Sequence, residues 1–153
     1  MATYFFDSSA LAKRYVAEIG TAWVQSLVDP ASGNDVYVAR ITLVELVSAI
    51  TRRQRRGDLT ASDAADALAD LRADFASDYL TIEVTAPLVG QAEALAERHA
   101  LRGYDAVQLA AGLQVNAILV AAGGAPLTLI SADLELNAAA AAEGLAVDDP
   151  NTH

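Results

Sequence analysis

The sequence contains no cysteine, only one lysine, two histidines and four prolines among 153 residues. The absence of cysteine excludes disulfide bonds and any thiolate metal site, and it suits a reducing compartment. No basic segment followed by an apolar core opens the chain, so we expect no secretory signal and a cytoplasmic location. The histidines, His99 and His153, lie in no Ser–His–Asp arrangement, and no glycine-rich phosphate loop is visible. The sequence therefore indicates neither a serine hydrolase nor a nucleotide-binding loop.

Long uninterrupted hydrophobic runs are also missing. Residues 106–132 carry no charge, but polar residues, glycines and a proline interrupt the segment: Gln108, Gln114, Asn116, Gly123, Gly124 and Pro126. A membrane span needs about 20 mostly apolar residues without such breaks. We therefore predict a buried helix, a turn and a buried strand here, and no membrane association.

Basic residues are scarce and unevenly placed. The net charge is −10, which argues against a nucleic-acid partner because phosphate binding normally uses basic surface. Residues 1–56, however, hold seven Lys or Arg against five Asp or Glu, including the run RRQRR at 52–56. This run either contacts RNA phosphates through Arg52, Arg53, Arg55 and Arg56, or stays solvated at a helix carboxyl end, where cations are favoured.

Apolar strands alternate with amphipathic helices along the chain. Strands are expected at 3–6, 36–39, 79–84 and 127–131, with a further short strand at 145–147. Helices are expected at 9–18, 21–28, 41–57, 60–78, 88–100, 104–122 and 133–144. Ser8 or Ser9 is expected to cap the first helix. The alternation predicts a mainly parallel sheet of four to five strands covered on both faces. We expect one domain over residues 1–148 and a frayed tail over 149–153.

Three aspartates lie where an open parallel sheet binds its ligands. Asp7 follows the first expected strand, Asp133 follows the strand 127–131, and Asp105 opens the helix at 104–122. Ligands bind beyond the carboxyl ends of the strands, so these side chains are candidates for one shared site. Each aspartate taken alone is also explained by helix capping, which typically contributes about 1 kcal/mol.

Glu45 lies inside the apolar segment ITLVELVSAI, on the helical face of Ile41 and Ala49. A buried carboxylate needs a cation, a proton or hydrogen bonds, because burying it unpaired costs several kcal/mol. The spacing from Thr42 also fits a capping box, in which Glu45 reaches back to the start of the helix. Spacing alone leaves both interpretations open. Arg52 shares this face but is seven residues farther on, too far for an easy ion pair.

Four motifs, YFFDSSALAKRY, ARITLVELVSAI, LRGYDAVQLAAGL and LISADLELNAAA, resemble the acidic motifs of PIN-domain ribonucleases, in particular the VapC-type toxins of toxin–antitoxin pairs. The resemblance covers essentially the whole chain in the expected order. It implies a PIN-like three-layer α/β/α fold and places the acidic site positions of the family at Asp7, Glu45, Asp105 and Asp133.

The resemblance implies a metal-dependent endoribonuclease that uses Mg²⁺ or Mn²⁺. Clustered carboxylates raise one another's pKa values, and hard cations with oxygen ligands relieve that crowding. Asp7, Asp105 and Asp133 would hold the metal, while Glu45 would bind it through water or orient the attacking water. Ser9, Ser131 and Asn137 are candidates to support the site, although capping is the favoured interpretation of Ser131 and ordinary helix surface that of Asn137. Tyr104 is expected to pack against the protein rather than to stack on a base.

The same resemblance implies an RNA substrate, a cognate antitoxin and a homodimer, in which two basic segments would come together. The alternatives are a nuclease acting on DNA, another metal phosphohydrolase, a non-toxin PIN-like nuclease of RNA turnover, and an inactive α/β protein-binding module. A receiver domain is disfavoured because Asp7 has no acidic neighbour and because the only lysine, Lys13, lies early in the chain.

Overall fold

The computed structural model describes all residues from Met1 to His153 and contains one five-stranded sheet. Its strands are β1 (Thr3–Phe6), β2 (Asp35–Ala39), β3 (Leu80–Ile82), β4 (Thr128–Ile130) and β5 (Ala146–Asp148). All neighbouring strands are parallel, in the order β3-β2-β1-β4-β5, and β1 lies at the centre with Phe5 opposite Tyr37 and Leu129. The predicted parallel sheet is therefore confirmed, with five strands.

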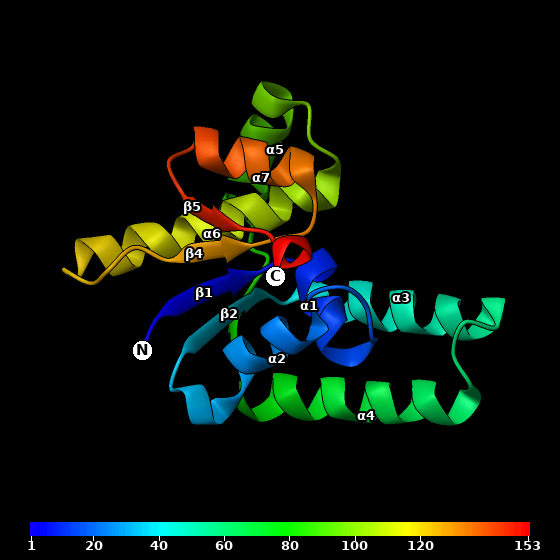
Figure 1. Cartoon of the computed structure of the whole chain (residues 1–153). Helices are drawn as coiled ribbons and strands as arrows, with labels where there is room; N and C mark the ends of the chain where they lie inside the picture. Colours follow the sequence, from blue (N-terminus) through cyan, green and yellow to red (C-terminus); the bar gives the residue numbers. More distant parts are fainter.

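Helices cover both faces of the sheet in a three-layer arrangement (Figure 1). They are α1 (Ser8–Tyr15), α2 (Thr21–Val28), α3 (Ile41–Arg56), α4 (Ala61–Ser77), α5 (Ala86–His99), α6 (Gly103–Ala121) and α7 (Leu134–Ala142), with short 3₁₀ helices η1 (Pro30–Ser32) and η2 (Pro150–Thr152). Helices α1 to α4 pack on one face and α5 to α7 on the other (Figure 1). The predicted α/β/α architecture is confirmed.

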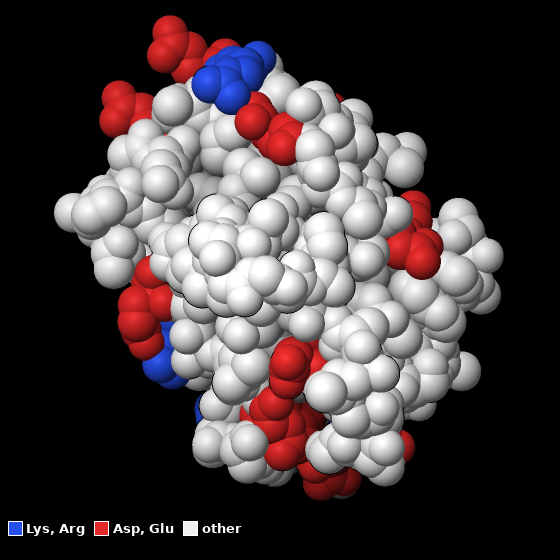
Figure 2. Space-filling view, turned by 90° about the vertical axis from the view of Figure 1, so that its left-hand side faces the viewer, with Lys and Arg blue, Asp and Glu red and all other residues white.

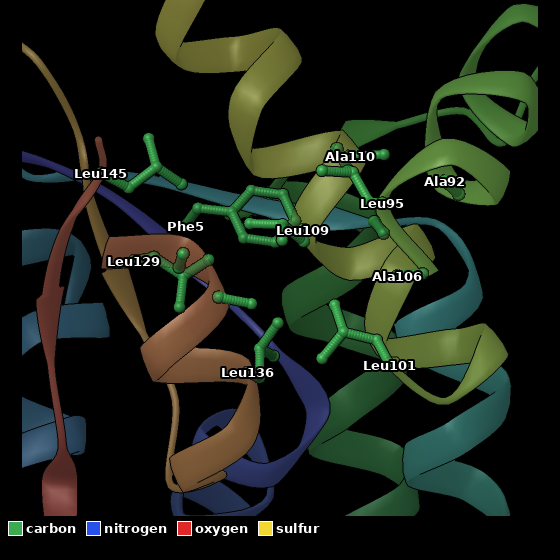
Figure 3. Close-up of a cluster of buried hydrophobic side chains, with 14 of the residues drawn as sticks. Phe5, Ala92, Leu95, Leu101, Ala106, Leu109, Ala110, Leu129, Leu136 and Leu145 are labelled. Carbon is green, nitrogen blue, oxygen red and sulfur yellow. The ribbon is translucent and has the colours of Figure 1, made fainter. Parts of the chain in front are cut away.

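Two adjacent phenylalanines in β1 belong to two different hydrophobic cores, one on each face of the sheet. Successive side chains of a strand point to opposite faces, so Phe5 packs under α5, α6 and α7 while Phe6 packs against α1 to α4. Both rings are fully buried. Figure 3 shows Phe5 among leucines and alanines of the first cluster, including Leu109 of α6 and Leu129 of β4. The aromatic run therefore fixes the central strand between both helical layers.

Helix α6 is the one helix that is long and apolar enough to cross a membrane by length and composition. In the structure it packs along the sheet, where Ala106, Leu109, Ala110 and Val115 belong to the same buried cluster as Phe5. Helix α6 is therefore a core helix, as predicted from the polar residues that interrupt its apolar sequence.

The observed elements differ from the predicted ones mainly at their ends. Helix α1 stops at Tyr15, three residues before its predicted end, and its N-cap is Asp7 rather than Ser8 or Ser9. The tail predicted to fray is ordered, so that prediction is wrong: Pro150 is buried against Gly20, and the His153 ring stacks on Trp23 at 3.9 Å between centroids. The contacts of Pro150 with Gly20 and of His153 with Trp23 hold the tail, and the composition of the tail did not indicate them.

The strand order creates a switch point between β1 and β4. The chain moves outward from β1 to β2 and β3, then returns across the sheet to β4 and β5 on the other side of β1. In such sheets, ligands bind outside the carboxyl ends of the strands at this point. The face at the amino ends of the strands shows mostly uncharged atoms, with acidic groups around them and few basic ones (Figure 2). The site is therefore expected at the carboxyl edge.

Candidate functional site

Four carboxylates line one cavity of about 500 Å³ at the carboxyl edge of the sheet: Asp7, Glu45, Asp105 and Asp133. They come from four separate segments, since Asp7 follows β1, Glu45 lies in the second turn of α3, Asp105 lies in the first turn of α6 and Asp133 follows β4. The structure thus brings together the residues that the motifs singled out.

Asp7 is the most enclosed of the four, with 3 % of its surface exposed. Its Oδ1 accepts a hydrogen bond from the Ala10 amide at 3.0 Å, which makes Asp7 the N-cap of α1. The Ser9 hydroxyl donates to the same carboxylate, with Oγ 2.8 Å from Oδ1 and 2.9 Å from Oδ2. Capping and membership of the acidic cavity are therefore both true of this residue, and neither excludes the other.

Burial raises the pKa of Asp7 to about 7, against the opposing effect of the Ala10 amide and of the Ser9 and Ser131 hydroxyls. The negative charge of Asp105 raises it further. The pKa of Asp105 is also raised, first by burial and then by the charges of Asp133 and Glu45, while Arg102 opposes the shift. The carboxylates therefore repel one another, as expected for acidic side chains that share a cation-binding site.

A chain of hydrogen bonds ties the end of β4 to the end of β1. The Ser9 Oγ accepts from the Ala132 amide at 2.9 Å and lies 3.4 Å from the Ser131 Oγ. The Ser131 Oγ accepts from the Asp133 amide at 3.0 Å, and Asn137 donates through Nδ2 to the Ser131 carbonyl at 2.8 Å. The Asp133 Oδ1 accepts from the Leu136 amide at 3.0 Å and caps α7. These bonds fix the separation of Asp7 and Asp133, although Ser131 and Asn137 do not line the cavity.

Glu45 is held by a residue that sequence reasoning missed. The Gln108 side chain is buried, and its Nε2 lies 2.9 Å from Glu45 Oε1, 2.8 Å from Thr42 Oγ1 and 3.3 Å from Ser8 Oγ. Helix α3 begins at Ile41 without a side-chain cap, and Thr42 faces Gln108, so the capping-box interpretation of Glu45 is wrong. Gln108 lies three residues after Asp105, on the same helical face, and that spacing was the sequence feature pointing to it.

Of the four arginines in the run RRQRR, only Arg53 lines the cavity. Arg52, Arg55 and Arg56 are exposed, and Arg56 pairs with Asp58 at 3.3 Å. The cavity face of α3 carries Glu45, Leu46, Ala49 and Arg53, so the basic residue on that face is Arg53 and not Arg52.

An apolar groove of about 730 Å³ adjoins the acidic cavity and shares Glu45, Asp105 and Asp133 with it. Its other walls come from α5 and from the start of α6, including Val89, which is 48 % exposed. Tyr104 lines this groove and is 60 % exposed, so the packing predicted for it leaves most of the ring open to solvent. The carboxylates thus stand between a polar cavity and an apolar surface.

The donor set suits a hard divalent cation. All four candidate ligands are carboxylates, the oxygen donors that Mg²⁺ and Mn²⁺ favour, and cysteine is absent. No three Asp, Glu or His side chains already form a cluster around a single position. A cation here would therefore draw carboxylates closer or be held partly through water, as is usual for Mg²⁺. Buried Asp7 and half-buried Asp105, whose pKa values are both raised, are the groups that such an ion would stabilise most.

Comparison with known proteins places the chain in a family. Residues 4–142 match the PIN domain family. Ribonuclease VapC45 from Mycobacterium tuberculosis is 38% identical over 117 residues, which cover 76% of this chain and 78% of the relative.

Solved structures share the fold at low sequence identity. VapBC2 from Rickettsia felis, bound to a DNA fragment from its promoter, matches with a TM-score of 0.63 and 14% identity, covering 96% of this chain and 98% of that one. Mycobacterium tuberculosis VapC20, described as a Sarcin-Ricin loop cleaving toxin, matches with a TM-score of 0.59 and 21% identity, covering 93% and 95%. With four acidic motifs in order, the same parallel sheet and this family match, the chain belongs to the PIN-domain family and is a relative of the VapC ribonucleases.

Proposed function

We propose that the protein is a cytoplasmic endoribonuclease that hydrolyses RNA phosphodiester bonds with Mg²⁺ or Mn²⁺, as the toxin of a VapBC-type toxin–antitoxin pair. One observation carries the proposal: four carboxylates from distant segments line one cavity at the switch point of the sheet. The similarity to a VapC ribonuclease over three quarters of the chain supports RNA as the substrate.

Each residue has a proposed role that follows from its position. Asp7, Asp105 and Asp133 provide carboxylate oxygens for the cation, with Asp7 deepest and held by Ser9 and the Ala10 amide. Glu45 orients the attacking water, because its Oε1 is fixed by Gln108 and its other oxygen is free to accept. When bound, a divalent cation supplies charge neutralisation, an acidified water and stabilisation of the leaving oxygen. Attack by water leaves 5′-phosphate and 3′-hydroxyl ends and does not need the RNA 2′-hydroxyl.

The proposal includes a cognate antitoxin and a homodimer. VapBC2 from Rickettsia felis is a pair of proteins solved together, which supports a partner for this chain as well. The apolar groove beside the carboxylates offers a surface where an antitoxin would bury apolar side chains and block the cavity.

An RNA-cleavage assay tests the function. We expect cleavage of single-stranded RNA with Mg²⁺ or Mn²⁺, none with a chelator, and a loss of about 100-fold or more in Asp105→Asn. Asp66→Asn, an exposed acid of α4, is the control and should cleave like the wild type. Single-stranded DNA and a simple phosphate ester should be poor substrates. Products ending in 2′,3′-cyclic phosphate, or activity indifferent to chelation and to Asp105→Asn, would refute the mechanism.

Gln108 should act as a positioning residue through Glu45. In Gln108→Leu, we expect kcat to fall about 10- to 100-fold with little change in KM, because Glu45 loses the donor that fixes it. Gln114→Leu, the same substitution two turns along α6, is the matched control. Steady-state kinetics and the pH profile of kcat provide the measurement. Equal kinetics for the two variants would remove Gln108 from the site.

A further inference from the structure

A fifth carboxylate, that of Glu18, lies between two basic side chains at the edge of the acidic cavity. Its Oε1 is 3.0 Å from Arg53 Nη2, and its Oε2 is 3.5 Å from Lys13 Nζ. All three residues line the cavity that contains Asp7, Glu45, Asp105 and Asp133. The cavity therefore has an acidic part and a basic part, and an anion of this protein occupies the basic part.

Lys13 is a fixed positive charge in the cavity wall. Its side chain is 4 % exposed, and Nζ donates to the Ile19 carbonyl at 2.8 Å and to Asn151 Oδ1 at 2.9 Å. Both of these acceptors are neutral, so Glu18 is the only carboxylate that pairs with the buried ammonium. The three acceptors satisfy the donors of the ammonium, but only one of them is an anion, and a buried cation favours an anion placed next to it.

The guanidinium of Arg53 has N–H donors that no protein group accepts. Arg53 makes one hydrogen bond, to Glu18, and its side chain is 31 % exposed. Glu18 is held loosely as well, because its side chain is 29 % exposed and lies in the loop between α1 and α2. The partly exposed Arg53–Glu18 pair contributes only about 0–1 kcal/mol, and a phosphate that replaces Glu18 restores an anion beside the buried Lys13.

We propose that Lys13 and Arg53 form a subsite for an RNA backbone phosphate, and that the Glu18 carboxylate occupies this subsite until RNA displaces it. The inference rests on the proposed RNA substrate. Carboxylate and phosphate present similar oxygens to a guanidinium, so the contacts of Glu18 show where phosphate oxygens would lie. Arg53 is eight residues beyond Glu45, or about 12 Å along α3, so the subsite takes a phosphate close to the scissile one but distinct from it.

The subsite also explains how an acidic protein holds RNA. The total charge of −10 opposes binding, and an exposed cluster of arginines is screened by salt. Lys13 and Arg53 instead lie beside the carboxylates. There they hold an RNA phosphate close to the one at the proposed metal site. Arg52, Arg55 and Arg56 do not line the cavity and contribute only through their general charge.

Binding of a labelled, random-sequence single-stranded RNA in the Asp7→Asn background, with Mg²⁺ present, tests the subsite. Arg53→Gln should weaken binding about 10-fold and lower the slope of log affinity against log salt by about 0.7, the value for one lost phosphate contact on a single strand. Glu18→Gln should tighten binding several-fold, and this gain should vanish when Arg53→Gln is added. Arg72→Gln, an exposed arginine of α4, should bind like the parent.

The outcomes separate the subsite from the function. If Arg53→Gln weakens binding no more than Arg52→Gln or Arg72→Gln, or if Glu18→Gln leaves binding unchanged or weaker, the subsite does not exist. The cleavage assay decides the enzymatic function independently, because the wild type either cuts RNA or does not. Thermal melts of each variant, compared with the parent, check that the variant is folded, so that a loss of binding is not caused by unfolding.

Discussion

Asp7→Asn is expected to abolish RNA cleavage while making the metal-free protein more stable. The loss of activity should reach about 10²–10³-fold or more, because the most enclosed anionic ligand is removed. The gain in stability has an independent cause, since burial raises the pKa of Asp7 to about 7 and the ionised form is costly inside the protein. Asparagine is also a good N-cap and can still accept from the Ala10 amide, so α1 keeps its start.

The pH dependence of this gain has a definite sign. The pKa of Asp7 in the folded state is about 7, whereas the unfolded chain releases this proton near the ordinary value of 3.8. The favourable contribution to folding is therefore complete below pH 3.8 and is lost as the pH rises from about 4 to about 7. A shift of this size corresponds to a few kcal/mol, on the order of 4, at 1.36 kcal/mol per pKa unit. The asparagine variant has no such loss.

Chemical denaturation in the presence of a chelator, at several pH values between 4 and 8, measures this difference. The stability of Asp7→Asn relative to the wild type should rise across that range. Added Mn²⁺ should then stabilise the wild type more than the variant, by about 2.7 kcal/mol when the ion reaches 100 times its dissociation constant. A difference that stays flat with pH would show that Asp7 is ionised in the folded protein without cost, and a variant with wild-type cleavage would remove Asp7 from the site.

Phe5→Ala is expected to cost about 3–5 kcal/mol of folding stability, the usual loss for truncating a buried phenylalanine. Phe5 is fully buried in the central strand and packs beneath α6, where its ring lies against Gly112. The loss is a large part of the 5–15 kcal/mol typical of a domain. For a chain of this length, it should lower the melting temperature by roughly 10 °C.

Urea unfolding gives the measurement, with a lowered midpoint and an unchanged slope. Ile118→Ala in α6 is the matched control, because its side chain is 60 % exposed and the change should stay within about 0.5 kcal/mol. A loss below about 1 kcal/mol for Phe5→Ala would mean that the cluster around α5, α6 and α7 does not form the core on that face.

The sequence predicted the elements well because their local chemistry agrees with their place in the fold. Helix α2 occupies the predicted residues 21–28, and α3 ends at the predicted Gly57, whose φ of 86° suits a glycine C-cap. The strand at 79–84 was predicted too long, since β3 pairs with β2 only over Leu80–Ile82. Strand ends depend on the partner strand, which a local pattern does not contain.

Parts of the site could not be predicted because they depend on contacts between distant segments. Gln108 meets Glu45 across 63 positions, and Ser9 meets Ala132 across 123. The acidic motifs placed the carboxylates correctly at one edge, yet Arg53 rather than Arg52 faces the cavity because the direction of α3 is set by its packing. Lys13, which the sequence offered only as evidence against a receiver domain, lies in the cavity wall.

The position of η2 determines what can be joined to this protein without disturbing the cavity. Asn151 lines the cavity and accepts a hydrogen bond from Lys13. Two residues later, the His153 ring stacks on Trp23. A segment fused after His153 therefore begins two residues beyond a side chain that lines the acidic cavity and contacts Lys13. A tag fused ahead of Met1, which is 99% exposed, emerges at the start of β1 and leaves the carboxyl edge of the sheet open (Figure 1).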